Sequence, residues 1–148
     1  MKRYSETPKK VFICSPLRPR GEMEEERQKD LHRNQQLARF ACRYATEHDY
    51  MPMAPHLYFT QFLDDADPQD REDGIHYGLK WLEECDEIWV IERRITEGMK
   101  HEIAAARKCG IREKHFVISL RPEERLLNDL IGEIFIEMYS NVVKRTFD

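Results

Sequence analysis

Residues 85–110, CDEIWVIERRITEGMKHEIAAARKCG, decide the fold. Within this stretch, Ile88–Ile91 is a short and continuous apolar run, which is typical of a strand buried in a parallel sheet. Thr96–Cys109 then has the residue spacing of a helix, and Gly110 follows as a natural C-terminal stop. The stretch therefore predicts a buried strand that leads into a helix, the repeating unit of an α/β fold.

The same alternation continues on both sides of this stretch. Val11–Cys14 and Phe116–Leu120 are further apolar runs that predict buried strands, and Tyr50–Pro55 is a weaker candidate in which Pro52 favours an edge position. Helices are expected at residues 22–48, 57–63, 75–85 and 126–143, with an acidic loop at 64–73. This order predicts an α/β fold with helices on both faces of a mostly parallel sheet of four to five strands.

The composition predicts a soluble protein of one domain spanning residues 1–148. Of the 148 residues, 41% are hydrophobic and 35% are charged, and the formal net charge is −4. An acidic chain is unsuited to non-specific binding of a nucleic acid polymer, which depends on neutralising phosphates. No apolar stretch approaches the roughly 20 residues that span a membrane, and the polar first ten residues do not resemble a signal peptide. We therefore expect a cytoplasmic protein that does not enter a membrane.

No metal or organic cofactor is expected. The four cysteines, Cys14, Cys42, Cys85 and Cys109, form no CxxC pair and are expected to be reduced thiols. The histidines lack the spacing of metal ligands, and the acidic loop lacks the pattern of a calcium loop.

The loop after the first strand is a candidate ligand site. Residues 15–21 combine the hydroxyl of Ser15 with Pro16, Leu17, Arg18, a second arginine and a glycine. Ligands of parallel sheets bind beyond the carboxyl ends of the strands, and arginine is suited to phosphate groups. The loop is neither a GxGxxG nor a Walker motif, so a proline-rich turn with solvated arginines is the alternative.

The start of the helix after Ile91 is the second candidate. Thr96 is a suitable N-cap, which leaves the backbone amides of Gly98 and Met99 among the unpaired donors of the first turn. Glu102 lies four residues after Gly98, and helical side chains lean towards the N-terminus, so its carboxylate is expected above the bare glycine. None of its neighbours at three and four residues is an ion-pair partner. The alternative is an unpaired glutamate in solvent.

Two further groups of residues have weaker claims. His56, within the PHLY sequence that ends at Tyr58, follows the weak strand and is suited either to contacting a ligand or to a structural hydrogen bond. The acidic loop at 64–73 is a source of a general acid, or simply a solvated loop.

Taken together, these motifs resemble the nucleoside 2-deoxyribosyltransferase superfamily. The resemblance covers residues 10–120 and rests on FICSPLR, APH, LxxCDEIWV and TEGMKHEIAAA, of which the TEGMxxEI helix start is the most specific. It is closest to small bacterial and phage members of that group. The resemblance implies a Rossmann-like or flavodoxin-like three-layer sandwich that binds a nucleoside or nucleotide.

The resemblance also implies roles for individual residues. Glu102 matches the glutamate that attacks the anomeric carbon of 2-deoxyribose, after which a second base or water accepts the sugar. In the related 2′-deoxynucleoside 5′-phosphate N-hydrolases, the 5′-phosphate and the rest of the substrate are held at positions that match those of Ser15, Leu17, Arg18, His56, Thr96 and Gly98. Members are commonly homo-oligomers. The apolar segment 130–143 either supplies such an interface or packs on the sheet.

One position departs from the family pattern. The family usually has an aspartate eight residues before the aspartate of the CDEIWV strand, and this chain has Gly78 there. Departure of the base needs protonation, so Asp73 and His76, or Asp64 and Asp65 in the acidic loop, are candidate replacements. Two functions follow as alternatives: a deoxyribosyltransferase or N-hydrolase with Glu102 as nucleophile, or a nucleotide-binding or sensing module that has lost the chemistry.

Overall fold

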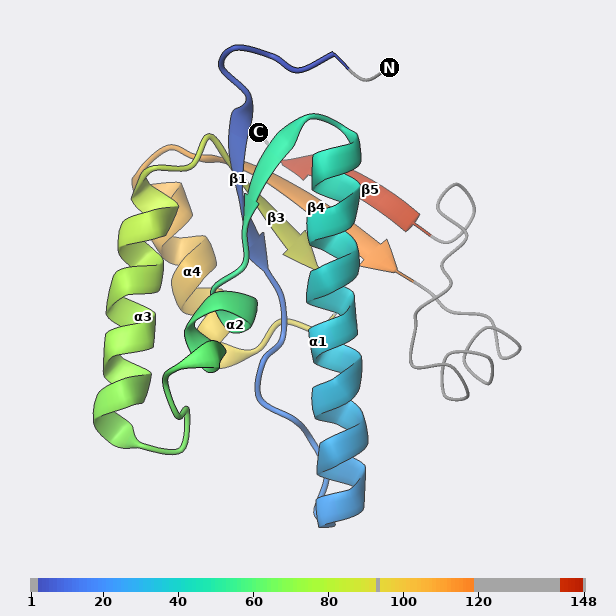
Figure 1. The fold of residues 1–148 in the computed structure, drawn as a ribbon, viewed down its shortest axis with the longest axis vertical. Coiled ribbons are helices and arrows are strands. Elements are labelled where there is room, and N and C mark those ends of the chain that lie inside the picture. Colours follow the sequence, from blue (N-terminus) through green and yellow to red (C-terminus); the bar gives the residue numbers. More distant parts are fainter. Residues whose placement is uncertain (1–2, 93, 119–141, 148) are drawn as a thin grey trace.

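The protein has a five-stranded sheet at its centre (Figure 1). A computed structural model describes residues 3–92, 94–118 and 142–147. The sheet order is β2-β1-β3-β4-β5, built from β1 (Lys9–Cys14), β2 (Tyr50–Met53), β3 (Glu87–Ile91), β4 (Arg112–Ile118) and β5 (Val142–Phe147). The first four strands are parallel, and β5 pairs with β4 in the antiparallel direction. The predicted α/β class with a mostly parallel sheet is therefore confirmed.

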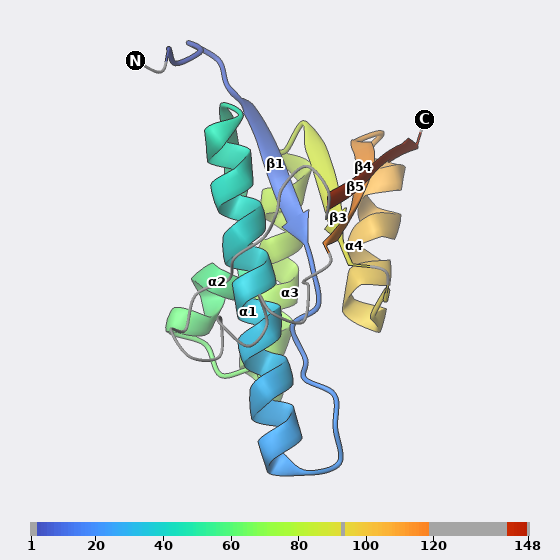
Figure 2. The ribbon, with the colours of Figure 1, turned by 90° about the vertical axis from the view of Figure 1, so that its right-hand side faces the viewer.

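Helices cover both faces of the sheet, which makes three layers (Figure 2). On one face, Val11 and Ile13 of β1 pack with Leu37 and Ala41 of α1 (Glu24–Glu47). On the other face, alternate strand residues such as Phe12 pack against α3 (Pro68–Glu83) and α4 (Glu97–Lys108). Because the strands are covered on both faces, their side chains form nearly continuous apolar runs.

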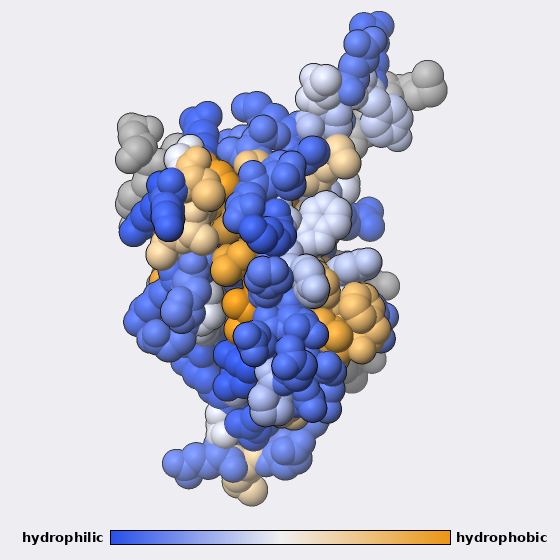
Figure 3. All heavy atoms as spheres, turned by 90° about the vertical axis from the view of Figure 1, so that its left-hand side faces the viewer, coloured by the Kyte–Doolittle hydropathy of each residue, from blue (hydrophilic) through white to orange (hydrophobic). Residues whose placement is uncertain are grey.

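The surface that includes α3 is mostly hydrophilic (Figure 3). Ile75, Tyr77 and Trp81 of α3 are nevertheless about half exposed. None of the helices in the described ranges is long and apolar enough to cross a membrane.

The segment between β2 and β3 differs from the sequence prediction. The helical stretch expected at 57–63 consists of α2 (Pro55–Tyr58) and a single 3₁₀ turn (Phe59–Gln61). The loop expected at 64–73 ends early, because α3 already begins at Pro68. Asp67 caps this helix by accepting hydrogen bonds from the backbone N–H groups of Gln69 and Asp70, both at 2.9 Å. The acidic residues therefore mark a helix start, where carboxylates satisfy free amides.

The C-terminal part also differs. Strand β4 begins at Arg112 rather than Phe116, and its first residues are charged. The helix expected at 126–143 lies largely outside the described residues, but Val142 and Val143 belong to β5 and not to a helix. The prediction of helix at these two positions was wrong, because an apolar pair fits a strand as well as a helix.

Candidate functional site

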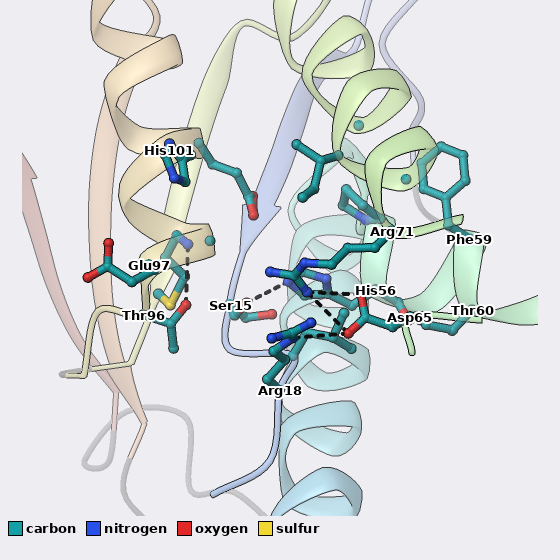
Figure 4. Close-up of a pocket in the computed structure, with 18 of the residues that line it drawn as sticks. Ser15, Arg18, His56, Phe59, Thr60, Asp65, Arg71, Thr96, Glu97 and His101 are labelled. Atoms are coloured by element: carbon teal, nitrogen blue, oxygen red, sulfur yellow. Dashed lines mark hydrogen bonds and ion pairs between the residues drawn. The ribbon is translucent and has the colours of Figure 1, made fainter. Parts of the chain in front are cut away.

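A cavity of about 640 Å³ opens at the carboxyl ends of β1 and β3 (Figure 4). One wall is the start of α4 with the segment that leads into it. The opposite wall consists of α2, the 3₁₀ turn and residues 70–79 of α3, and the loop after β1 contributes Ser15 and Arg18. Ligands of parallel α/β sheets bind in this location.

The start of α4 is fixed by its cap. The Thr96 Oγ1 atom accepts a hydrogen bond from the backbone N–H of Met99 at 3.2 Å. At Gly98, an added Cβ would meet only Thr96 Oγ1 within 4 Å, at 3.9 Å, so the first turn is open towards the cavity. The first-turn amides of a helix have no partner within the helix and carry partial positive charge. The cap thus engages the Met99 amide, which the sequence predicts to be unpaired, and this wall offers the remaining first-turn amides to an anionic or oxygen-rich ligand.

Glu102 lies one turn further along α4 and lines the same cavity. Its Oε2 atom is buried and has no hydrogen-bond partner among the described residues. Burial raises the pKa of Glu102 to about 8, because the ionised form is poorly solvated there. A carboxyl group placed in this way is costly to keep in an empty cavity and is suited to reacting with or binding a ligand.

The end of β1 supplies a second unpaired group. Ser15 is 1% exposed, and its Oγ atom has no hydrogen-bond partner within the described part of the chain. The Ser15 carbonyl is 2.6 Å from His56 Nε2. A carbonyl oxygen only accepts, so Nε2 carries the proton and donates it, and Nδ1 is unprotonated in the neutral ring. Burial lowers the pKa of His56, which keeps the ring neutral.

Three charged side chains join the loop after β1 to α3. The Arg18 Nε atom donates to Asp65 Oδ2 at 3.2 Å, and Arg71 Nη1 donates to Oδ1 and Oδ2 at 3.2 and 3.3 Å. All three residues line the cavity, and Figure 4 shows them on the side opposite Thr96. Asp65 was one of the residues proposed from sequence to replace the missing aspartate, and it is held here by two guanidinium groups.

Arg94 is another cationic group at the cavity that sequence analysis did not single out. Its Nε and Nη2 atoms are buried without a hydrogen-bond partner in the described ranges. Burial first, and then the nearby charge of Arg20, lower the pKa of Arg94. Buried guanidinium donors without partners favour an anion, and the position of Arg94 two residues before Thr96 was the only signal in the sequence.

Besides Asp65, the cavity brings together eight of the residues predicted from sequence, and it leaves out Pro16, Tyr58, Asp64, Asp73 and His76. The eight are Ser15, Leu17, Arg18, His56, Thr96, Gly98, Met99 and Glu102. Pro16 is buried beside it, and Tyr58 is half exposed against Phe59 and Phe62. Neither Asp73 nor His76 lines the cavity, because the lining face of α3 is formed by residues 70, 71, 74, 75, 78 and 79. Asp73 instead accepts a hydrogen bond from Gln69 Nε2 at 3.0 Å.

Comparison with known proteins identifies a family and solved structures of similar fold. The model of a family described as "Domain of unknown function (DUF7768)" matches residues 9–116. The fold is similar to that of a 2-deoxyribosyltransferase from the psychrotolerant bacterium Bacillus psychrosaccharolyticus, with a TM-score of 0.54 and 15% sequence identity over 81% of this chain and 80% of that chain. No curated protein matches the chain. At this identity the likeness concerns the fold alone.

Proposed function

The chain belongs to the DUF7768 family, and on that premise we propose that it breaks the N-glycosidic bond of a nucleoside or nucleotide, by hydrolysis or by 2-deoxyribosyl transfer, with Glu102 as the nucleophile. The similar fold of a protein described as a 2-deoxyribosyltransferase supports the proposal. The observation that carries it is the Glu102 carboxyl group, which lines the cavity with an unpaired Oε2 atom.

The chemistry that suits this carboxyl group is nucleophilic displacement in two steps. The ionised Glu102 donates an electron pair to the anomeric carbon, and the bond from that carbon to the base nitrogen breaks with its pair going to the base. Water or a second base then takes the sugar from the glycosyl ester and regenerates the carboxylate. The transition state has oxocarbenium character, so an adjacent carboxylate stabilises it. Because the Glu102 Oε2 atom accepts no hydrogen bond from the described residues, no such bond has to be broken when it attacks.

The cationic side of the cavity is suited to the phosphate of a nucleoside 5′-monophosphate. Ser15 Oγ and the Nε and Nη2 donors of Arg94 lie at this cavity without partners among the described residues, and the first turn of α4 opens onto it. Phosphate oxygens accept several charge-assisted hydrogen bonds at once. A monophosphate would therefore satisfy groups that are otherwise buried and unpaired.

A binding or sensing module is the second candidate, and Gly78 is the observation that favours it. This glycine lines the cavity without contributing a carboxyl group. A site that only binds has no need of an acid to assist the leaving base.

Base release measured by chromatography distinguishes the two candidates. Wild-type protein and Glu102→Gln would be incubated with 2′-deoxynucleosides and their 5′-monophosphates, with and without an acceptor base. We expect release by the wild type and a loss of about 10⁴-fold or more in the variant, because removing a nucleophile costs at least this much. The matched control is Glu83→Gln, a glutamate paired with Lys80 on the surface of α3, which should keep wild-type activity.

The alternative result is equally clear. If the wild type releases no base from any substrate, but nucleotides raise its melting temperature, the enzymatic proposal fails and the binding module is supported.

A further inference from the structure

Beyond the cation Arg71, the face of α3 that lines the cavity carries two glycines and the apolar side chains of Ile75 and Leu79. Arg71, Gly74 and Gly78 are spaced by three and four residues, so they share one face of the helix, and all three line the cavity. An added Cβ at Gly74 would meet only Leu63 at 3.8 Å, and one at Gly78 would meet Pro55 at 3.6 Å. These are ordinary contacts, so packing does not demand either glycine. Their effect is to leave room beside the guanidinium on a wall that is otherwise apolar.

Arg71 is held so that part of its guanidinium stays available. Its hydrogen bonds to described residues use Nη1 alone, and both go to Asp65. Asp65 is held in turn by Arg18, which belongs to the loop after β1. The Arg71 side chain is 33% exposed and lies at the cavity (Figure 4). Asp65 therefore holds the guanidinium of Arg71 through Nη1 and leaves its Nε and Nη2 atoms to donate to a ligand.

The other groups on this side of the cavity are poorly suited to protonating a departing base. The oxygens of Asp65 accept hydrogen bonds from two guanidinium groups. Asp70 Oδ2 accepts from the backbone N–H of Asp64 at 2.9 Å. His56 donates its Nε2 proton to a carbonyl, and burial lowers the pKa of the ring. Position 78, where a carboxyl would fit, is a glycine.

We propose that Arg71 binds the departing base from the α3 wall and stabilises its negative charge by hydrogen bonds, taking the part that protonation by a carboxylic acid would otherwise play. The inference rests on the proposed function. The anomeric C–N bond breaks, its electron pair stays on the base, and Glu102 forms the new bond to carbon. The base anion, held by the guanidinium, then takes the proton released when water hydrolyses the glycosyl ester.

This arrangement also selects the class of base. A guanidinium offers two parallel donors, which match the adjacent O6 and N7 acceptors of a 6-oxopurine. Adenine presents an amino group in place of O6, so one of the two donors would meet another donor. Phe59 lines the same part of the cavity and supplies an aromatic surface for the ring (Figure 4). We therefore assign the subsite to guanine or hypoxanthine.

The test compares two leaving groups in the same protein. Base release from 2′-deoxyguanosine 5′-monophosphate and from its 7-methyl derivative would be measured for wild type, Arg71→Gln and Arg71→Lys. The methylated purine leaves as a neutral molecule and needs no stabilisation of an anion. We expect Arg71→Gln to lose about 100-fold or more in kcat on the unmethylated substrate and less than about fivefold on the methylated one. Arg71→Lys should fall between.

Each other outcome has a distinct meaning. An equal loss on both substrates would make Arg71 a structural residue and overturn the inference, while leaving the proposed function intact. Failure of the wild type on both substrates would overturn the proposed function itself. Asp65→Asn removes the charge that holds Arg71 in place but keeps the guanidinium. This variant should therefore lose more kcat on the unmethylated substrate than on the methylated one, although by less than Arg71→Gln. Melting curves of all variants identify any that fail to fold, in which case Arg71→Lys decides.

Discussion

Two glutamate carboxyl groups are buried near opposite ends of the sheet, and their surroundings differ completely. Glu87, at the start of β3, has its carboxylate 2.7 Å from Lys114 Nζ and accepts hydrogen bonds from Tyr50 at 3.0 Å and Trp89 at 3.1 Å. Burial acts to raise the pKa of Glu87, but these partners outweigh it and the pKa is lowered. Glu102, at the carboxyl end, has an unpaired oxygen and a pKa raised by burial.

The contrast separates a structural end of the sheet from a reactive end. A buried charge with every lone pair engaged joins neighbouring strands, whereas a buried carboxyl without partners weakens the fold. The protein retains Glu102 at the end of the sheet where the cavity lies. We interpret the loss of stability caused by the unpaired carboxyl as the consequence of a cavity that binds a ligand.

The largest expected effect is on the pH dependence of stability. The pKa of Glu102 is raised from an unfolded value near 4.5 to about 8. Between these values the folded state binds more protons than the unfolded state, so the free energy of unfolding falls as pH rises through this window. The fall amounts to at most about 5 kcal/mol, and it levels off above pH 8. Urea titrations of wild type and Glu102→Gln from pH 5 to 9 measure it.

The glutamine variant cannot ionise, so its stability should lack this slope and exceed that of the wild type at pH 9. Parallel curves for the two proteins would show that Glu102 is solvated and would remove the contrast with Glu87.

The next largest effect concerns the ion pair between Glu87 and Lys114 at the other end of the sheet. Lys114→Met removes the closest partner of Glu87 and leaves a buried carboxylate with less compensation. We expect a loss of about 3 kcal/mol in the free energy of unfolding, as for other broken buried ion pairs. Adding Glu87→Gln to this variant should recover part of the loss, because the uncompensated charge is gone. Unchanged stability in the single variant would mean that the pair contributes nothing.

The smallest expected effect is the loss of stability on removing a helix cap, and it is measured for one cap at the cavity and one away from it. Thr96→Ala and Asp67→Ala each remove a side chain that accepts a hydrogen bond from the first turn, and each should cost about 1 kcal/mol in unfolding free energy. Only Thr96 lines the cavity, so only Thr96→Ala should also weaken nucleotide binding. Calorimetric titration with a nucleoside 5′-monophosphate checks this, and equal affinities of the two variants would contradict it.

Elements defined by local pattern could be predicted from the sequence. The runs at β1 and β3 are apolar because helices cover both faces, and Pro52 correctly indicated an edge strand. Thr96 caps α4 and the helix ends before Gly110, as its residue types favour. The grouping of Ser15 and Glu102 at one cavity followed from the rule that strand ends of a parallel sheet lie at a common edge.

The rest depends on contacts that are distant in the sequence. Strand β4 begins with charged residues because Lys114 pairs with Glu87 and because Glu113 accepts from Arg107 at 2.8 Å, partners that no local pattern reveals. Arg71 was missed because the acidic residues before it were interpreted as loop, which hid the helix face it shares with Gly78. The strand β5 was missed because a short apolar pair has no period.

The unpaired carboxyl of Glu102 also gives the protein an internal spectroscopic label. A neutral carboxylic acid absorbs in the infrared apart from the ionised carboxylates that dominate the surface of so charged a chain. At neutral pH the raised pKa holds Glu102 largely in that neutral form. Occupation of the cavity that ionises this group would therefore be visible as the loss of one isolated band, without any dye or substituted residue.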